Sequence, residues 1–178
     1  MSDRVHILGI AGSLRRQSYN RAALRAAKQL VPEDATLDIF ELHGIPVFNE
    51  DDERPLPGKV VKLKQQIREA DALLIGTPEY NYSIPGVLKN AIDWASRPYG
   101  DSAWAGKPVA VMGASVGKLA TVRAQYHLRQ LFVFLNMFPV NQPEVMIGNA
   151  TEQFDAQGNL KDEATKELIR LLLRNLVD

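Results

Sequence analysis

Apolar runs and amphipathic stretches alternate along the whole chain. Residues 5–11 and 72–77 are almost entirely apolar, which is typical of strands buried on both faces. Residues 36–42 alternate apolar and polar side chains, as an edge strand does. Shorter runs at 109–112 and 143–147 complete a set of five predicted strands. Five strands separated by helical stretches predict a parallel sheet with helices on both faces.

Helical periodicity fills the segments between these strands and the end of the chain. The predicted helices cover residues 19–30, 59–70, 85–96 and 119–137, and a closing helix begins near Asp162. In that last helix we expect Leu168, Leu171 and Leu172 to face the core. The segment 148–160 is rich in Asn, Gln, Asp and Gly, so it is predicted to be a surface excursion.

The alternation of strands and helices continues without a linker, repeat or low-complexity tract. A chain of 178 residues, 46% of them hydrophobic and 24% charged, suits one domain with a sizeable core. We therefore expect a single α/β domain over residues 1–178, a flavodoxin-like doubly wound five-stranded parallel sheet. In such sheets ligands bind outside the carboxyl ends of the strands, where the strand order reverses.

Charge and composition exclude several classes of function. With 21 basic and 21 acidic residues the formal net charge is zero, which argues against a nucleic-acid or membrane-surface partner. The absence of cysteine excludes disulfides, thiolate metal sites and a cysteine nucleophile. The histidines, His6, His43 and His127, lack metal-ligand spacing, so no metal is predicted. No charged-then-apolar leader and no apolar run of roughly 18 residues is found, which predicts a cytoplasmic protein.

The first predicted strand ends in a turn whose side chains suit a phosphate. Gly12 permits a sharp bend, and Ser13, Ser18 and Asn20 follow as hydroxyl and amide donors before the first helix. The free N–H groups and the dipole of a helix start favour negative charge. Cationic side chains nearby are Arg15, Arg16 and Arg21. The alternative is an ordinary strand-to-helix turn with a serine cap and solvated arginines.

Other nucleotide and nucleophile motifs are absent. The turn lacks the G-x-G-x-x-G fingerprint, because Gly9 and Gly12 are three residues apart and no third glycine follows. Residues 113–119 resemble a P-loop, but the glycines are one residue too close and Leu119 replaces the Ser or Thr that holds magnesium. The surroundings of Ser13 are not G-x-S-x-G, which argues against a hydrolase.

Two further strand ends are loops of small or hydrogen-bonding residues, at 78–81 and 113–117. Because the carboxyl ends of parallel strands meet at one edge, these loops and the first turn can converge on one ligand. In the third loop Gly113, Ser115 and Gly117 suit a close approach of backbone N–H groups to a flat ligand. An ordinary turn is the alternative for each residue taken singly.

Three motifs stand in a fixed order along nearly the whole chain. They are Gly12-Ser13-Leu14-Arg15 with Ser18 and Asn20, then residues 77–83 with Pro85-Gly86 and 88–94, and finally residues 125–130. Together they resemble the NADPH-dependent FMN reductase family, in its branch of bacterial quinone and chromate reductases. The chain departs from that family at Ala120 and Thr121, where relatives commonly carry a pair of glycines.

The resemblance implies an FMN-dependent enzyme that passes electrons from NADPH or NADH to quinones, free flavin, azo compounds or chromate. It implies that the first motif holds the FMN phosphate, that residues 78–81 lie along the ribityl chain and ring, and that the Ser115 loop meets the pyrimidine edge. The cofactor-binding residues so assigned are Gly12, Ser13, Leu14, Arg15, Ser18, Asn20, Pro78, Glu79, Tyr80, Asn81, Ser115 and Gly117. Tyr82 is the candidate for stacking on substrate, and no catalytic side chain is required because the flavin carries the chemistry.

Two other functions share the predicted fold: a flavodoxin-type electron carrier and a non-catalytic interaction module. Such carriers are typically very acidic whereas this chain is neutral, and the intact phosphate turn argues against an empty module. Relatives form dimers that pair into tetramers, so we expect a homodimer or homotetramer. Arg123, Tyr126 and Arg129 then lie in subunit contacts or in intramolecular packing. Since no second nucleotide domain is evident, donor and acceptor must take turns, which predicts ping-pong kinetics.

Overall fold

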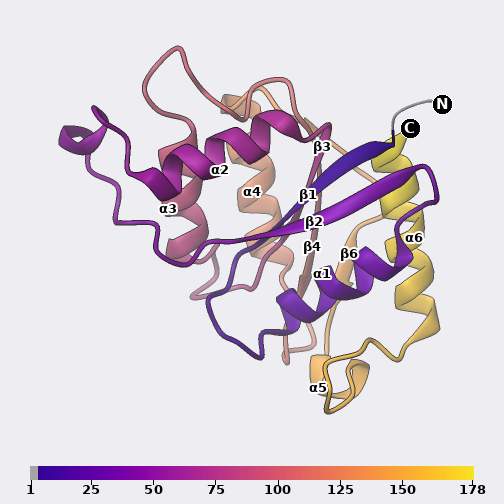
Figure 1. Ribbon diagram of the computed structural model, residues 1–178. Coiled ribbons are helices and arrows are strands. Elements are labelled where there is room, and N and C mark those ends of the chain that lie inside the picture. Colours follow the sequence, from indigo (N-terminus) through magenta and orange to yellow (C-terminus); the bar gives the residue numbers. More distant parts are fainter. Residues whose placement is uncertain (1–3) are drawn as a thin grey trace.

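Six strands form one sheet in the computed structural model, which describes residues 4–178 (Figure 1). They are β1 (Val5–Ala11), β2 (Ala35–Glu41), β3 (Ala72–Gly76), β4 (Pro108–Ala114), β5 (Phe138–Pro139) and β6 (Val145–Ile147). The order along the sheet is β2-β1-β3-β4-β5, and β6 also pairs with β4. All of these pairings are parallel. This is the predicted flavodoxin-like doubly wound order, whose direction reverses between β1 and β3. Residues 1–3 of the predicted domain lie outside the described residues.

The fifth position of the sheet is filled by two short strands instead of the single strand predicted at 143–147. β5 pairs with the beginning of β4, and β6 pairs with its end. Pro139 and Pro143 lie in and between the two short strands. Because proline lacks the N–H that a sheet requires, a continuous strand here is disfavoured and the pairing is interrupted.

The helices alternate with the strands as the periodicity predicts. They are α1 (Tyr19–Leu30), α2 (Gly58–Glu69), α3 (Gly86–Ala95), α4 (Val122–Phe134), the short α5 (Ala150–Gln153) and α6 (Glu163–Val177), with a 3₁₀ turn η1 (Glu50–Asp52) before α2. The fourth helix is shorter than the predicted 119–137. Ala120 and Asn136 adopt left-handed backbone angles, with φ of 50° and 53°, and a helix cannot continue through either.

The buried face of α6 differs from the prediction. Leu172 is buried as expected, but Leu168 and Leu171 are 42% and 50% exposed. The residues buried on this helix are Ile169, Leu172, Leu173 and Leu176. Apolar residues occupy two adjacent faces of α6, so periodicity alone does not choose between them, and packing against α1 and the sheet decides.

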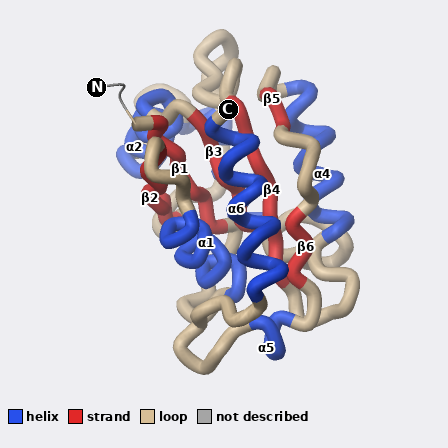
Figure 2. Tube along the Cα trace, turned by 90° about the vertical axis from the view of Figure 1, so that its right-hand side faces the viewer, coloured by secondary structure: helices blue, strands red, loops and turns tan. Residues whose placement is uncertain are grey.

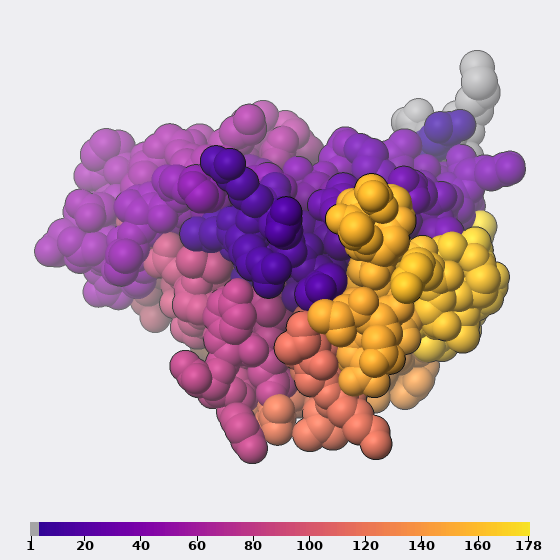
Figure 3. All heavy atoms as spheres, turned by 90° about the horizontal axis from the view of Figure 1, so that it is seen from below, coloured from indigo at the N-terminus to yellow at the C-terminus, as the bar shows by residue number. Residues whose placement is uncertain are grey.

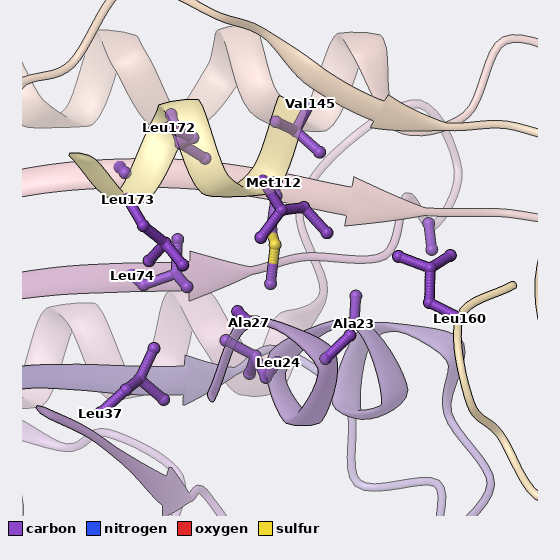
Figure 4. Close-up of a cluster of buried hydrophobic side chains, with 14 of the residues drawn as sticks. Ala23, Leu24, Ala27, Leu37, Leu74, Met112, Val145, Leu160, Leu172 and Leu173 are labelled. Atoms are coloured by element: carbon purple, nitrogen blue, oxygen red, sulfur yellow. The ribbon is translucent and has the colours of Figure 1, made fainter. Parts of the chain in front are cut away.

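Helices cover both faces of the sheet. In Figure 2, α1 and α6 lie side by side over one face, and they are in direct contact. Figure 4 shows the core beneath them, where side chains of α1 such as Leu24 and of α6 such as Leu173 meet Leu74 and Met112 of the sheet. The second core joins the other face of the sheet to α2, α3 and α4. Alternate residues of β1 enter the two cores, with Ile7 in the first and Leu8 in the second.

Candidate functional site

The three predicted loops meet at the carboxyl edge of β1, β3 and β4, the edge seen in Figure 3. A cleft of about 250 Å³, here the inner cleft, is lined by Ser13, Arg15, Ser18, Tyr19, Asn20, Pro78, Glu79, Tyr80, Ala114, Ser115 and Val116. A second cleft of about 510 Å³, the outer cleft, shares Glu79 and Ser115 and adds Asn81, Tyr82, Gly117, Lys118, Leu119, Ala120 and Arg123. Of the predicted site residues, only Gly12 and Leu14 line neither cleft.

Hydroxyl groups organise the first turn. Ser18 is the N-cap of α1, and its Oγ accepts hydrogen bonds from the backbone N–H groups of Asn20 and Arg21 at 3.2 and 3.5 Å. Ser13 is 3% exposed, and its Oγ accepts from the N–H of Arg15 at 3.3 Å. These bonds fix the loop that approaches the helix. The serine cap, offered above as the alternative to a phosphate site, therefore coexists with the cleft.

Unpaired donors surround this turn. Within residues 4–178, no acceptor is found for the backbone N–H groups of Ser13, Leu14, Arg16 and Gln17. A turn with successive free N–H groups before a helix start forms a concavity that suits an anion. The exposed side chain of Arg15 adds a cation beside it. Leu14, which lines neither cleft, contributes at most its backbone to such a site.

Arg21 was expected among the cations near the turn, but its charge is used elsewhere. Its Nη2 lies 2.7 Å from Oε1 of Glu41, at the end of β2. The same guanidinium donates a long bond of 3.5 Å to the Arg15 carbonyl. Arg21 therefore ties α1 to the neighbouring strand and supports the turn, rather than presenting a free positive charge.

Asn20 connects two walls of the inner cleft. Its side-chain Nδ2 donates to the carbonyl of Ala114 at 2.9 Å, and its Oδ1 accepts from the N–H of Ala114 at 2.8 Å. The residue is 2% exposed. Because this pair of bonds occupies the amide, the predicted side-chain donor is used inside the protein. Asn20 positions the end of β4 against α1.

Glu79 acts on α4, which the sequence did not reveal. Its carboxylate is 7% exposed and accepts from the backbone N–H groups of Arg123 and Ala124 at 3.0 and 3.2 Å. It also pairs with the Arg123 guanidinium. Thr121, the N-cap residue, makes no side-chain capping bond, so Glu79 supplies the cap from the loop after β3. Its carboxylate is directed to the helix start, while the residue lines both clefts.

A tight two-residue hairpin forms the wall of the outer cleft. Tyr80 and Ser83 exchange two backbone hydrogen bonds of 3.0 Å. Between them, Asn81 and Tyr82 both have positive φ, 49° and 68°, as a type I′ turn requires. Tyr82 is 69% exposed, and the Arg123 guanidinium lies 3.9 Å from its ring centre, a cation–π distance. A bulky residue in this backbone region is strained, which is common at functional sites.

The third loop is packed closely against its neighbours. A Cβ on Gly113 would overlap Oγ1 of Thr121 and the carbonyl oxygen of Thr77, so only glycine fits there. The N–H of Ser115 donates to the carbonyl of Ile147 at 3.0 Å and is not free. The N–H of Gly117 donates to Oγ of Ser115 at 3.2 Å.

Fewer backbone donors than expected therefore remain in this loop. Of the backbone N–H groups in residues 115–117, that of Val116 is the one for which residues 4–178 provide no acceptor. Val116 is exposed and lines the inner cleft, so its N–H is the donor that this loop offers to a flat ligand. The sequence did not single it out, because valine carries no polar side chain.

The residues predicted for subunit contacts all have partners within the chain. Arg123 pairs with Glu79. The hydroxyl of Tyr126 donates to Oε1 of Glu144 at 2.9 Å, and this bond raises the pKa of Tyr126 above its ordinary value. Arg129 donates to Oδ1 of Asn141 and to the carbonyl of Val140, both at 3.2 Å. The intramolecular alternative is thus realised for each residue.

Across residues 4–178, no helix has both the length and the apolarity needed to cross a membrane. In the same part of the chain, no group of three or more His, Asp or Glu residues is arranged to hold a metal ion.

Comparison with known proteins agrees with this geometry. The model of the NADPH-dependent FMN reductase family matches residues 5–152. An NAD(P)H-dependent FMN reductase of Pseudomonas aeruginosa is 54% identical over 177 residues, covering 99% of this chain and 95% of that protein. A 2-hydroxy-1,4-benzoquinone reductase of a Burkholderia species is 44% identical, covering 92% and 90%. The structure of FerB, a flavoenzyme NAD(P)H:(acceptor) oxidoreductase from Paracoccus denitrificans, superposes with a TM-score of 0.88 at 36% identity, covering 98% and 96%.

Proposed function

The chain belongs to the NADPH-dependent FMN reductase family, and we propose that it is an FMN-dependent oxidoreductase that passes electrons from NADPH or NADH to quinones. The observation that carries this proposal is that the inner and outer clefts adjoin at the carboxyl edge of the sheet. They share Glu79 and Ser115, and they join an anion-binding turn at one end to aromatic and small residues at the other. This distribution suits a flat ring linked to a phosphate.

The phosphate end of the proposed site is the first turn. The unpaired N–H groups of Ser13, Leu14, Arg16 and Gln17 and the guanidinium of Arg15 would hold the phosphate, while Ser13 and Ser18 fix the loop. Gly12 allows the chain to turn, and Asn20 holds the opposite wall. Since a monophosphate suits this pocket, FMN is the proposed flavin.

The ring end is formed by the loops after β3 and β4. Pro78, Glu79, Tyr80 and Asn81 supply one side, and Ser115, Val116 and Gly117 supply the other. Bound FMN supplies the hydride chemistry, and the protein supplies placement and electrostatics. With FMN bound in the clefts, the N–H of Val116 would be available to stabilise negative charge on the pyrimidine edge, in the manner of an oxyanion hole. No acid or base side chain is required.

Quinones are the proposed acceptors because proteins similar to this chain are named quinone reductases, including one of Escherichia coli with 41% identity. Free flavin, azo compounds and chromate are further acceptors that an open flavin face accommodates. A flavodoxin-type carrier is distinguished by direct oxidation of NAD(P)H, which a carrier does not perform. A flavin-free interaction module is distinguished by the absence of FMN released from the purified protein on denaturation.

Donor and acceptor bind in turn at one face of the outer cleft beside Tyr82. Taking turns predicts ping-pong kinetics, with parallel lines in double-reciprocal plots of initial velocity. Replacing Tyr82 by Ala removes an exposed aromatic ring, so we expect altered KM values for both NAD(P)H and quinone while the FMN content stays unchanged. Intersecting lines would require a ternary complex and would contradict the shared site.

We also propose a homodimer or homotetramer with flavin sites at subunit interfaces. Assembly itself is supported by apolar side chains at the end of α4 and the start of β5, which lie at the amino edge of the sheet, opposite the clefts. Val133, Phe134 and Phe138 are 83%, 81% and 59% exposed. Large exposed apolar patches are typical of protein interfaces. The position of the flavin sites at interfaces is an expectation from the family resemblance. Sedimentation analysis at micromolar concentration tests this, and a monomer there would contradict it.

The remaining proposals concern organisation and location. Residues 1–178 form a single domain, supported by one continuous sheet in the described residues. We place the protein in the cytoplasm, without nucleic-acid or membrane partners, supported by its zero formal net charge and its dependence on NAD(P)H. Fractionation of cells, with the FMN-dependent activity assayed in each fraction, tests the location.

A further inference from the structure

A third cleft, of about 390 Å³, opens beside the first turn and shares Arg15, Ser18 and Tyr19 with the inner cleft. It lies between α1 and residues 155–158, which precede α6. Figure 3 shows orange atoms of the segment after α5 beside the indigo and violet atoms of the first turn and α1. We call it the arginine cleft. The phosphate-binding role proposed above for the first turn involves only the part of the turn that lines the inner cleft.

The arginine cleft carries excess positive charge. Arg15, Arg16 and Arg25 line it, all three are exposed, and none forms an ion pair within residues 4–178. The acidic residue in the lining is Asp155. Its carboxylate accepts from Asn159 Nδ2 and from the N–H groups of Gln157 and Asn159 at 2.8–2.9 Å. Bonds from Asn159 lower the pKa of Asp155, so the group is charged but directed into its own loop.

The walls of the cleft are preformed. The loop is closed by hydrogen bonds between the backbones of Asp155 and Asn159 and between Gly158 and Asp155. Gly158 has a φ of 80°, and a Cβ there would lie 2.8 Å from Nη2 of Arg25, so glycine allows the guanidinium to rest on the loop. On the other wall the Tyr19 ring packs against Phe154, with ring centres 5.4 Å apart.

We propose that the arginine cleft is a subsite for the phosphorylated adenosine of a dinucleotide. Guanidinium groups bind phosphate oxygens with charge-assisted hydrogen bonds, and the Tyr19 ring provides an aromatic surface for a purine. The volume falls within the range of roughly 300–1,000 Å³ found for small-molecule sites, which is more than an inorganic phosphate requires. Both features together favour a nucleotide over a simple anion.

Two dinucleotides of flavin and nicotinamide chemistry, FAD and NADPH, carry a phosphorylated adenosine. In FAD the adenylate continues directly from the flavin phosphate, and the cleft adjoins the turn at which that phosphate is placed. In NADPH the adenosine carries a 2′-phosphate. The proposal rests on the proposed function, because it takes the first turn as the flavin phosphate site, and the experiment separates the two sources.

The test uses Arg25→Ala and Arg25→Gln, which both remove the charge of an exposed arginine outside the proposed FMN site. Binding of FMN and of FAD to the flavin-free protein is measured by quenching of flavin fluorescence, and the KM values for NADPH and NADH are measured with the FMN-loaded enzyme. Loss of a charge-assisted hydrogen bond predicts a ten- to hundred-fold weakening for the ligand whose adenosine occupies the cleft. FMN affinity should stay within about two-fold. Arg54→Ala, another exposed arginine but outside the cleft, is the matched control.

The outcomes distinguish the alternatives. Weaker FAD binding with unchanged KM values assigns the cleft to FAD, and a raised KM for NADPH with unchanged FAD binding assigns it to the nicotinamide donor. Unchanged affinity for FAD together with unchanged KM values for NADPH and NADH in both variants overturns the proposal. An equal loss of FMN and FAD affinity overturns it too. A wild-type protein that binds no FMN would overturn the proposed function instead.

Discussion

The two ends of the candidate site are built in different ways. At the phosphate end, residues 13–18, the organising side-chain bonds of Ser13 and Ser18 reach only two or three residues along the chain, and none of these residues has a positive φ. At the ring end, Asn81, Tyr82 and Ala120 have left-handed backbone angles. The ring end also depends on Glu79, which caps a helix 44 residues later.

This difference indicates where each end is vulnerable. The phosphate end is a local turn with unpaired donors, so its substitutions should change ligand affinity more than folding. The ring end stores backbone strain, and the surrounding packing must hold that strain. Substitutions at the ring end should lower the stability of the fold, and any loss of activity should follow from that loss of stability. The predictions below test this contrast.

The largest effect is expected for Gly113→Ala at the ring end. The added Cβ would overlap Thr121 Oγ1 and the Thr77 carbonyl oxygen, both in fixed surroundings, because Thr121 and Thr77 are fully buried. Overpacking of this kind costs about 3 kcal/mol of unfolding free energy. Urea denaturation measures the loss, and a lowered FMN content should accompany it.

Gly117→Ala is the matched control in the same loop. The nearest atom to a Cβ there is Ser115 Oγ at 3.7 Å, an ordinary contact, so stability should stay within about 0.5 kcal/mol of wild type. If both variants unfold at the same urea concentration as wild type, the close packing assigned to Gly113 is wrong.

At the phosphate end, Arg15→Ala should lower affinity rather than stability. Arg15 is exposed and lines the inner cleft, and its guanidinium lies 6.0 Å from the centre of the Tyr19 ring. Loss of a charge-assisted bond to phosphate should cost about 1.5–3 kcal/mol of binding, or roughly one to two decades in Kd for FMN. Riboflavin, which lacks the phosphate, is the control ligand. Equal weakening of both ligands would contradict the phosphate assignment.

The contrast also explains which features the sequence predicts. The first helix was expected over 19–30 and is found at Tyr19–Leu30, since its serine cap and apolar spacing are local signals. The parallel sheet with helices between its strands follows from the alternation of strands and helices. The convergence of three loops on one edge was predicted for the same reason.

What the sequence did not predict depends on distant partners. Arg21 pairs with Glu41, Glu79 caps α4, and Asn20 binds the backbone of Ala114, 94 residues away. Each residue type is equally compatible with ligand binding, so no local pattern separates the two roles. The same limit applies to α6, where Leu168 and Leu171 lie on an apolar face that tertiary packing leaves exposed.

The smallest effect is expected for Ala120→Gly, and its value lies in its comparison with Ala124→Gly. Ala120 and Ala124 are both buried, but Ala120 has a φ of 50° whereas Ala124 lies within α4. Glycine at either position loses a buried methyl group, about 0.8 kcal/mol, and adds backbone entropy to the unfolded chain, about 0.5–1 kcal/mol. At Ala120 alone the change also relieves left-handed strain of about 1–2 kcal/mol.

These contributions nearly cancel at Ala120, so Ala120→Gly should change the unfolding free energy by less than about 0.5 kcal/mol. Ala124→Gly should lower it by about 1.3–1.8 kcal/mol. Urea denaturation of the two variants side by side measures the difference, which isolates the strain. Equal destabilisation by both variants would mean that Ala120 carries no strain, and the contrast between the two ends of the site would then rest on Asn81 and Tyr82 alone.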